Sequence, residues 1–220
     1  MTFIPAAKAA LAGALLATGS AASAATVLFV GGAGGLGAGQ TNYADFDTTF
    51  GNQSGVSAGS GVFAASVAGV AANPATGNGV DPDSFFAVLG GGTATFSFAQ
   101  AVGIFGFDLG SSDEYNTLTL NFVNGPSQSF TGEQLNLAFD ANGNQIDAGN
   151  NGRVTISSFG DRITSVTFSS RQNSFEFDNL GIGAIPEPSV WAMLILGFGV
   201  IGGSLRRRTA KGWAARAALV

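Results

Sequence analysis

The stretch Thr93-Ala94-Thr95-Phe96-Ser97-Phe98 alternates polar and apolar residues without a break. Successive side chains of a β-strand point to opposite faces, so this period of two predicts a strand with one buried face. The pattern returns along the chain in segments rich in Phe, Thr and Val, which are bounded by Gly, Asn, Asp and Ser. The further predicted strands are residues 104–109, 117–122, 153–157, 163–168 and 174–177, with a candidate at 27–30.

The predicted strands follow one another without a long amphipathic helix between residues 25 and 185. This order indicates a mainly β protein, an antiparallel β-sandwich with Phe as the main core residue. Residues 31–61 are rich in Gly and Ser and weakly periodic, so we expect loops or irregular strands there. Cysteine is absent, so burial or bound ions must stabilise the sandwich in place of disulfides.

The first 24 residues have the order of an export signal. Lys8 precedes an apolar run at residues 9–17, and the small residues Ala22-Ser23-Ala24 follow. We therefore predict an N-terminal signal helix that signal peptidase removes after Ala24, with Ala22 and Ala24 as the recognised positions. The alternative is an alanine-rich helical or disordered start.

A second apolar segment, residues 189–205, contains no ionisable side chain and is followed by three arginines at 206–208. As a helix, 17 residues at about 1.5 Å each span roughly 26 Å, which suffices for a thin bilayer. Because arginines resist translocation, we expect a transmembrane helix at 189–205, with 206–208 and a tail at 209–220 in the cytoplasm. A buried core helix of a soluble domain is the alternative.

The order Pro-Glu-Pro, apolar segment and arginine cluster resembles the PEP-CTERM sorting signal of Gram-negative bacteria, in its Pro-Glu-Pro-x-x-Trp-Ala variant. The resemblance covers residues 186–208, and residues 209–220 extend beyond the usual end of such signals. It implies a substrate of exosortase, a membrane-embedded transpeptidase-like protease. The inner membrane would hold the chain before delivery to the cell surface or exopolysaccharide matrix. The implied sorting residues are Pro186, Glu187, Pro188, Trp191, Arg206, Arg207 and Arg208.

Charge is distributed unevenly along the chain. All 14 acidic residues lie between Asp45 and Glu187, with only Arg153, Arg162 and Arg171 among the 9 basic ones. Three positive against fourteen negative charges leave this part at −11. Nucleic acid and anionic lipid bind through positive charge, so neither is an expected partner. Cations or a hydrated polysaccharide suit this surface better.

Residues 105–118 and 174–180 resemble the ectodomains of other exosortase substrates, which are similar to carbohydrate-binding jelly rolls. This resemblance spans residues 93–184 and implies a jelly-roll-like ectodomain at 25–185, without naming a ligand. Sugar binding commonly uses exposed aromatic rings, and between the two end segments only Tyr43 and Tyr115 are Tyr or Trp. Carbohydrate binding, with exopolysaccharide as partner, is therefore an alternative and not the first hypothesis.

Catalysis has few candidate groups. The chain contains no His and no Cys, which excludes the Ser-His-Asp, Cys-His and histidine-metal arrangements within it. Paired carboxylates stay formally open, with Asp113-Glu114 and Asp81-Pro82-Asp83 as the close pairs. Adjacent strand residues point to opposite faces, and carboxylates in turns usually cap amides. We interpret both pairs as solvated turn residues and expect no enzyme.

Calcium is the one cofactor that the sequence suggests. The run Asp140-Ala141-Asn142-Gly143-Asn144 places oxygen ligands at alternate positions, as calcium loops do. It lacks the glycine and glutamate of the full motif, at Gln145 and Asn151, so an ordinary hairpin turn competes with this interpretation. Asp178 follows an alternating strand, where related modules often hold calcium. The sequence leaves two hypotheses: no cofactor, or calcium at Asp140, Asn142, Asn144 and Asp178.

The sequence thus predicts an exported, non-enzymatic surface or matrix protein that exosortase sorts and processes. The alternatives are a calcium-assisted carbohydrate-binding module and a permanently anchored membrane protein.

Overall fold

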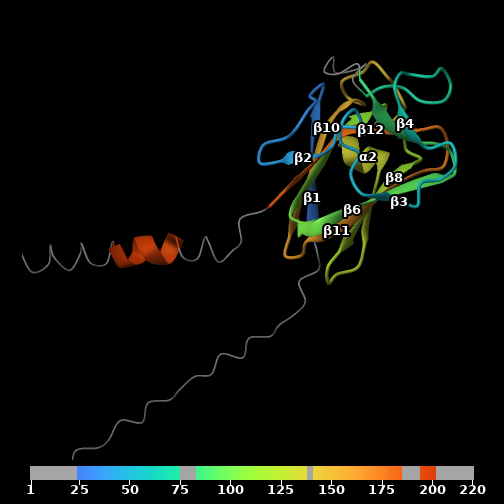
Figure 1. Cartoon of the computed structure of the whole chain (residues 1–220). Helices are drawn as coiled ribbons and strands as arrows, with labels where there is room; N and C mark the ends of the chain where they lie inside the picture. The colour runs from blue at the N-terminus through green and yellow to red at the C-terminus, as the bar shows by residue number, and fades with distance from the viewer. Residues whose placement is uncertain (1–23, 75–82, 138–140, 185–193, 202–220) are drawn as a thin grey trace, which may run out of the picture.

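A computed structural model describes residues 24–74, 83–137, 141–184 and 194–201. The described residues form two antiparallel sheets that share one apolar core (Figure 1). One sheet has seven strands in the order β1-β10-β7-β12-β5-β4, with β2 paired on β12. The other has five, in the order β3-β6-β11-β8-β9. The predicted antiparallel β-sandwich is therefore confirmed.

The seven-stranded sheet consists of β1 (Ala24–Gly31), β2 (Thr41–Ala44), β4 (Gly61–Phe63), β5 (Phe85–Val88), β7 (Ile104–Gly110), β10 (Gly152–Phe159) and β12 (Phe175–Gly183). The five-stranded sheet consists of β3 (Gln53–Ser54), β6 (Gly92–Val102), β8 (Asn116–Phe122), β9 (Gln128–Thr131) and β11 (Ile163–Ser170). A short helix, α2 (Gly132–Asn136), follows β9. Each strand expected from alternation coincides with an observed one, although the last begins at Phe175 and extends further than expected.

Residues 31–61 are largely irregular, as the sequence predicts. Between residues 32 and 61 the strands β2 and β3 are only 4 and 2 residues long, and bends and turns connect them. The candidate strand at residues 27–30 is part of the longer β1, which pairs with β10 along its whole length. Pairing with β10 supplies hydrogen bonds that local periodicity cannot reveal, which explains why β1 exceeds the prediction.

Phenylalanine fills the space between the sheets. Phe168 of β11 and Phe177 of β12 stack across the sandwich, with ring centroids 3.7 Å apart and planes inclined by 16°. Both side chains are fully buried, and the rings of Phe96, Phe107 and Phe175 pack around them. Each such burial contributes about 1.5–3 kcal/mol to stability. The aromatic core therefore fixes how the two sheets face each other.

The central strands of the seven-stranded sheet are buried on both faces. In β8 buried and half-buried residues alternate, as expected for a strand with one covered face. In β12, by contrast, Phe175, Phe177 and Leu180 belong to the core, yet Glu176 and Asp178 between them are also buried. The outer face of this sheet is thus covered, and it carries charged side chains.

The C-terminal segment is described only in part. Residues 194–201 are helical, and their large apolar side chains are 48–71% exposed. Within the described residues, no helix has both the length and the apolar character needed to cross a membrane. The remainder of the predicted transmembrane helix at 189–205 lies outside the described residues, as does the predicted signal helix up to residue 23.

Candidate functional site

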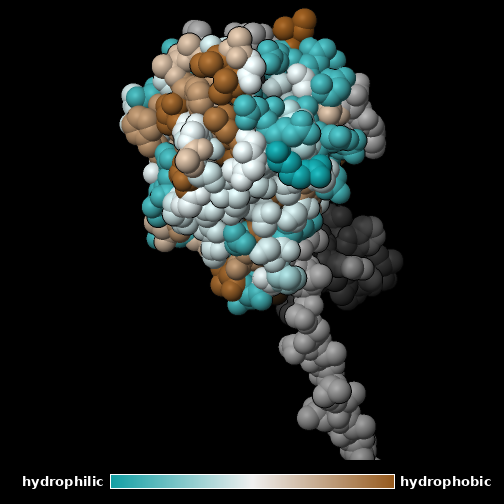
Figure 2. All heavy atoms as spheres, turned by 90° about the vertical axis from the view of Figure 1, so that its right-hand side faces the viewer, coloured by the Kyte–Doolittle hydropathy of each residue, from teal (hydrophilic) through white to brown (hydrophobic). Residues whose placement is uncertain are grey.

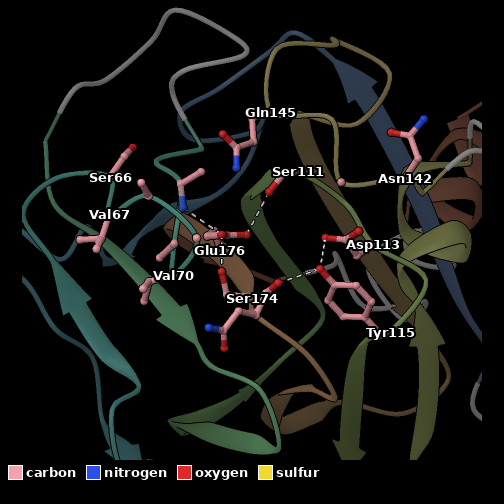
Figure 3. A pocket seen from close by; sticks show the side chains of 16 residues that line it. Ser66, Val67, Val70, Ser111, Asp113, Tyr115, Asn142, Gln145, Ser174 and Glu176 are labelled. Atoms are coloured by element: carbon pink, nitrogen blue, oxygen red, sulfur yellow. Dashed lines mark hydrogen bonds between the residues drawn. The ribbon is translucent and has the colours of Figure 1, made fainter.

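A pocket of about 500 Å³ opens beside the buried carboxyl group of Glu176 (Figure 3). Its walls come from residues 66–72 after β4, 111–115 between β7 and β8, 142–145 before β10, and 173–176 at the start of β12. A volume of ~300–1,000 Å³ is typical of small-molecule sites. The sandwich therefore forms a cavity large enough for a ligand from four stretches that are distant in sequence.

Glu176 lies at the centre of the pocket and accepts three hydrogen bonds (Figure 3). Its Oε1 accepts from the backbone N–H of Ala72 at 2.9 Å and from the hydroxyl of Ser174, and its Oε2 accepts from Ser111 Oγ at 3.0 Å. Burial raises the pKa of the Glu176 carboxyl, and these three donors act in the opposite direction. The carboxyl group thus joins three segments of the pocket wall.

Asp113 and Tyr115 form the opposite side of the pocket (Figure 3). The Tyr115 hydroxyl lies 2.7 Å from Asp113 Oδ2 and 2.8 Å from the carbonyl oxygen of Asn173, and it shares its single proton between these acceptors. Burial raises the pKa of Asp113, and the charge of Glu114 adds to this effect. Burial also raises the pKa of Tyr115, as do the hydrogen bond to Asp113 and the charges of Asp113 and Glu176. Negative charge therefore dominates this side.

Gly143 makes the position of Asp113 possible. Its backbone has a φ of +69°, which residues with a Cβ rarely adopt. A Cβ at this position would also come within 2.6 Å of Asp113 Oδ1. The short bridge between Asp113 and Asn142 brings these two segments together, with Gly143 N donating to the carbonyl of Ser112 at 2.9 Å.

The wall at residues 66–72 is a small loop closed by its own backbone. Val67 N donates to the carbonyl of Ala71 at 2.8 Å, and Ala71 N donates back to that of Val67 at 3.0 Å. Apart from Ser66, the residues of this wall are Val, Ala and Gly. The face that carries β4, turned toward the viewer in Figure 2, shows an apolar area beside hydrophilic surface. Exposed Val62 and Val67 lie in and after β4. The pocket wall at residues 66–72 therefore consists of small, mainly apolar residues, while Asp113 and Glu176 line other parts of the pocket.

A second polar cluster, the Arg153 charge row, lies on the outer face of the same sheet. Arg153 of β10, Asp108 of β7 and Asp178 of β12 are direct cross-strand neighbours, and all three are buried. Arg153 Nη1 donates to Asp108 Oδ1 at 3.0 Å and to the carbonyl of Asn179 at 2.7 Å. Burial raises the pKa of Asp108 despite the opposing charge of Arg153. The row holds two carboxyl groups and one guanidinium. Because Arg153 bonds to a neighbouring side chain and to the backbone of the same sheet, we interpret the row as a structural cluster.

The loop before β2 covers this row. Gln40 Oε1 accepts a hydrogen bond from Arg153 Nη2, and Gly35 N donates to Asp108 Oδ2 at 2.7 Å. A Cβ at Gly106 would come within 2.5 Å of Gln40 Nε2, so glycine at this position lets the loop lie directly on β7. The glycine-rich stretch after β1 thus has a packing role.

The predicted calcium ligands fall in two places. Asn142 and Asn144 lie in one turn, where Asn142 Oδ1 accepts from Asn144 N and Asn144 Oδ1 accepts from Ile146 N, both at 3.1 Å. Asp178 belongs to the Arg153 charge row, and Asp140 lies outside the described residues. Within the part of the chain that is described, no group of three or more His, Cys, Asp or Glu could hold a metal ion. Calcium binding stays a prediction.

The predicted processing residues lie mostly at the ends that are not described. Ala24 is the first residue of β1, and Ala22 lies before the described residues. The predicted sorting residues all fall outside them: Pro186, Glu187, Pro188, Trp191, Arg206, Arg207 and Arg208.

Sequence reasoning missed the pocket. Glu176 lies between Phe175 and Phe177 in a predicted alternating strand, which places it on the outward face and suggests contact with solvent. The signal in the sequence is an acidic residue placed directly between two phenylalanines of a predicted strand. The sequence predicts a solvated turn residue at Asp113, and this prediction is wrong, because Asp113 is half-buried in the pocket wall.

The described residues define an antiparallel β-sandwich protein with a polar pocket at one edge. Comparison with family models identifies the segment that follows: residues 184–208 match the PEP-CTERM protein-sorting motif. The chain therefore carries a PEP-CTERM sorting motif, as its resemblance predicted. A search of curated proteins finds no match.

A search of solved structures finds a similarity to TmCBM61, whose structure was determined in complex with β-1,4-galactotriose. The identity is 15%, the match covers 66% of this chain and 99% of that chain, and the TM-score is 0.32. A TM-score at this level carries no argument about the ligand of this chain.

Proposed function

We propose that this protein is an exported, non-enzymatic β-sandwich that exosortase processes through its C-terminal motif and delivers to the cell surface or extracellular matrix. One observation carries the proposal: β12 ends at Gly183, and the matched sorting motif begins at residue 184. Cleavage anywhere after residue 184 therefore removes no strand of the sandwich. The processed product would keep its whole core.

The N-terminal end supports the same proposal. The predicted signal-peptidase cleavage after Ala24 leaves Ala25 as the new first residue, at the start of β1. Seven of the eight cross-strand pairs between β1 and β10 would remain, from Ala25 to Gly31. The two predicted processing sites thus flank the sandwich and leave its strands almost complete.

In this proposal the signal helix starts export, and a transmembrane helix at residues 189–205 holds the chain in the inner membrane. The arginines at 206–208 stop transfer and keep residues 209–220 in the cytoplasm. The helical, apolar residues 194–201 are consistent with such an anchor. We also assign the sandwich to the jelly-roll type, because β5, β12, β7 and β10 are neighbours in one sheet and β6, β11, β8 and β9 in the other.

The test compares cells with and without exosortase. We expect fractionation and intact mass to show loss of the segment after Pro188 and release from the inner membrane only when exosortase is present. Glu187→Gln, which removes the charge of the motif at nearly constant size, should leave the chain unprocessed. Glu133→Gln is the matched control, because Glu133 is exposed in α2 and distant in sequence from the motif.

An unchanged C-terminus in the inner membrane of both strains would overturn the proposal. The protein would then be the permanently anchored alternative.

A further inference from the structure

The pocket beside Glu176 presents negative charge without a compensating cation. Asp113 and Glu176 both line it, and none of its lining residues in the described chain is Lys or Arg. The charges of Asp113 and Glu176 both act on Tyr115, so the potentials of the two carboxyl groups overlap in this cavity. This arrangement disfavours an anionic ligand and favours a positively charged one.

The carboxyl groups of Asp113 and Glu176 differ in whether an oxygen remains to accept a hydrogen bond from a ligand. Both oxygens of Glu176 already accept hydrogen bonds from Ala72, Ser111 and Ser174. Asp113 accepts from Tyr115 through Oδ2, and no described residue donates to its Oδ1. Asp113 is also only half-buried, so Oδ1 is the acceptor that an incoming donor would use.

The size and the second wall of the pocket favour an organic cation over a metal ion. A cavity of about 500 Å³ is far larger than an ion, and no group of three acidic, His or Cys residues surrounds a point in the described chain. The wall at residues 66–72 adds apolar surface, because Val67 lines the cavity and its side chain is 44% exposed. A ligand with a charged end and an apolar stem would contact both walls.

We propose that this pocket binds a protonated primary amine on an unbranched alkyl stem, such as the side chain of a lysine in another molecule. Asp113 is the counter-charge, and the wall at residues 66–72 contacts the stem. The two lysines of this chain, Lys8 and Lys211, lie outside the described residues, so no described residue supplies the amine. The inference does not depend on exosortase, because every lining residue precedes the sorting motif.

To test the proposal, two matched probes are titrated against the full-length chain in a neutral detergent, and saturation-transfer NMR measures their binding. Nα-acetyl-lysine methylamide carries the ammonium, and Nα,Nε-diacetyl-lysine methylamide has the same stem without the charge. We expect the first to bind with a Kd of about 1 mM or below, as suits a ligand of this size, and the second to bind at least tenfold more weakly.

Two pairs of variants assign the binding to the pocket. Asp113→Asn should weaken binding of the amine at least tenfold, whereas Glu114→Gln removes an equal charge one residue away, outside the lining, and should change it less than threefold. Val67→Lys adds a positive charge at the rim, and the fold should tolerate it because the Val67 side chain is 44% exposed. It should also weaken binding at least tenfold, whereas Val67→Gln should not.

Equal binding of the two probes would overturn the proposal. Unchanged binding by both Asp113→Asn and Val67→Lys would do the same. Glucosamine is the third probe, because an amino sugar carries a primary amine without an alkyl stem. Binding of glucosamine without binding of the lysine derivative would refute the alkyl stem and favour a saccharide ligand.

Discussion

Replacement of Glu176 by Ala tests whether this buried carboxyl group holds the pocket together. The substitution removes the acceptor for Ala72 N, Ser111 Oγ and Ser174 Oγ. The two hydroxyls can rotate toward other acceptors, whereas the backbone N–H of Ala72 cannot. A buried donor without an acceptor costs about 1–3 kcal/mol, and a hydrogen bond to a charged group contributes about 1.5–3 kcal/mol. We therefore expect Glu176→Ala to lower the unfolding free energy by about 3 kcal/mol.

Glu176→Gln separates the hydrogen bonds from the charge. The amide oxygen can still accept from Ala72 and Ser174, and the amide nitrogen can donate to Ser111 once that hydroxyl rotates. The expected loss is below about 1 kcal/mol at neutral pH, because the variant also removes the cost of burying a charge.

The pH dependence of the two proteins should differ in a defined direction. Burial raises the pKa of Glu176 above its ordinary value of 4.5, so the folded protein holds this proton more tightly than the unfolded chain. Its contribution to stability is complete below pH 4.5 and is lost as the pH rises through the folded-state pKa. Glutamine does not titrate. The stability of Glu176→Gln relative to the wild type should therefore increase as the pH rises above 4.5.

Urea and thermal unfolding measure the change in stability and its pH dependence. The full-length chain is unfolded in neutral detergent, and circular dichroism of the β-sheet monitors the transition. A loss of 3 kcal/mol corresponds to a decrease in Tm of about 6–12 °C for a domain of this size. If Glu176→Ala is as stable as the wild type at pH 7, the carboxyl group does not join the segments as argued. A difference between Glu176→Gln and the wild type that is constant with pH would refute the burial of a titrating group.

Two further predictions concern the core and the charge row, with unfolding measured in the same way. Phe177→Ala should cost about 3–5 kcal/mol because its ring is fully buried, whereas Phe159→Ala, 57% exposed, should cost less than about 0.5 kcal/mol; equal losses would contradict the assigned core. Arg153→Met should cost about 3–5 kcal/mol because Asp108 and Asp178 lose their buried cation, whereas Arg171→Met on the exposed surface should be nearly neutral. A stable Arg153→Met protein would show that the two carboxyl groups are protonated or solvated.

Local pattern was sufficient for most of the strands. Alternation in the stretch from Thr93 to Phe98 reports which side chains meet the core, because neighbouring strands do not alter the period of two. The prediction was weakest where pairing partners decide the structure. Strand β1 is longer than its sequence suggests because β10 binds it along eight residues, and β3 is only two residues long.

The candidate site depended on what covers the outward face of a strand. The same alternation that placed Phe175 and Phe177 in the core placed Glu176 opposite them, and it could not say whether solvent or protein lies there. Residues 66–72 and the turn at Asp113 cover Glu176. In sequence, Ala72 is 104 residues away from Glu176 and Asp113 is 63 residues away. Cross-strand register likewise aligned Asp178 with Asp108 and Arg153.

The sequence by itself determined the β-sandwich class, the acidic charge of residues 45–187 and the presence of the sorting motif. Each of these is a property of contiguous residues: periodicity, composition and a linear motif. Only the tertiary structure decided which carboxyl groups are buried, which of them have partners, and where a cavity remains between loops. These properties depend on strand order and loop packing, because burial and electrostatic environment are set by whichever distant residues lie within a few ångströms.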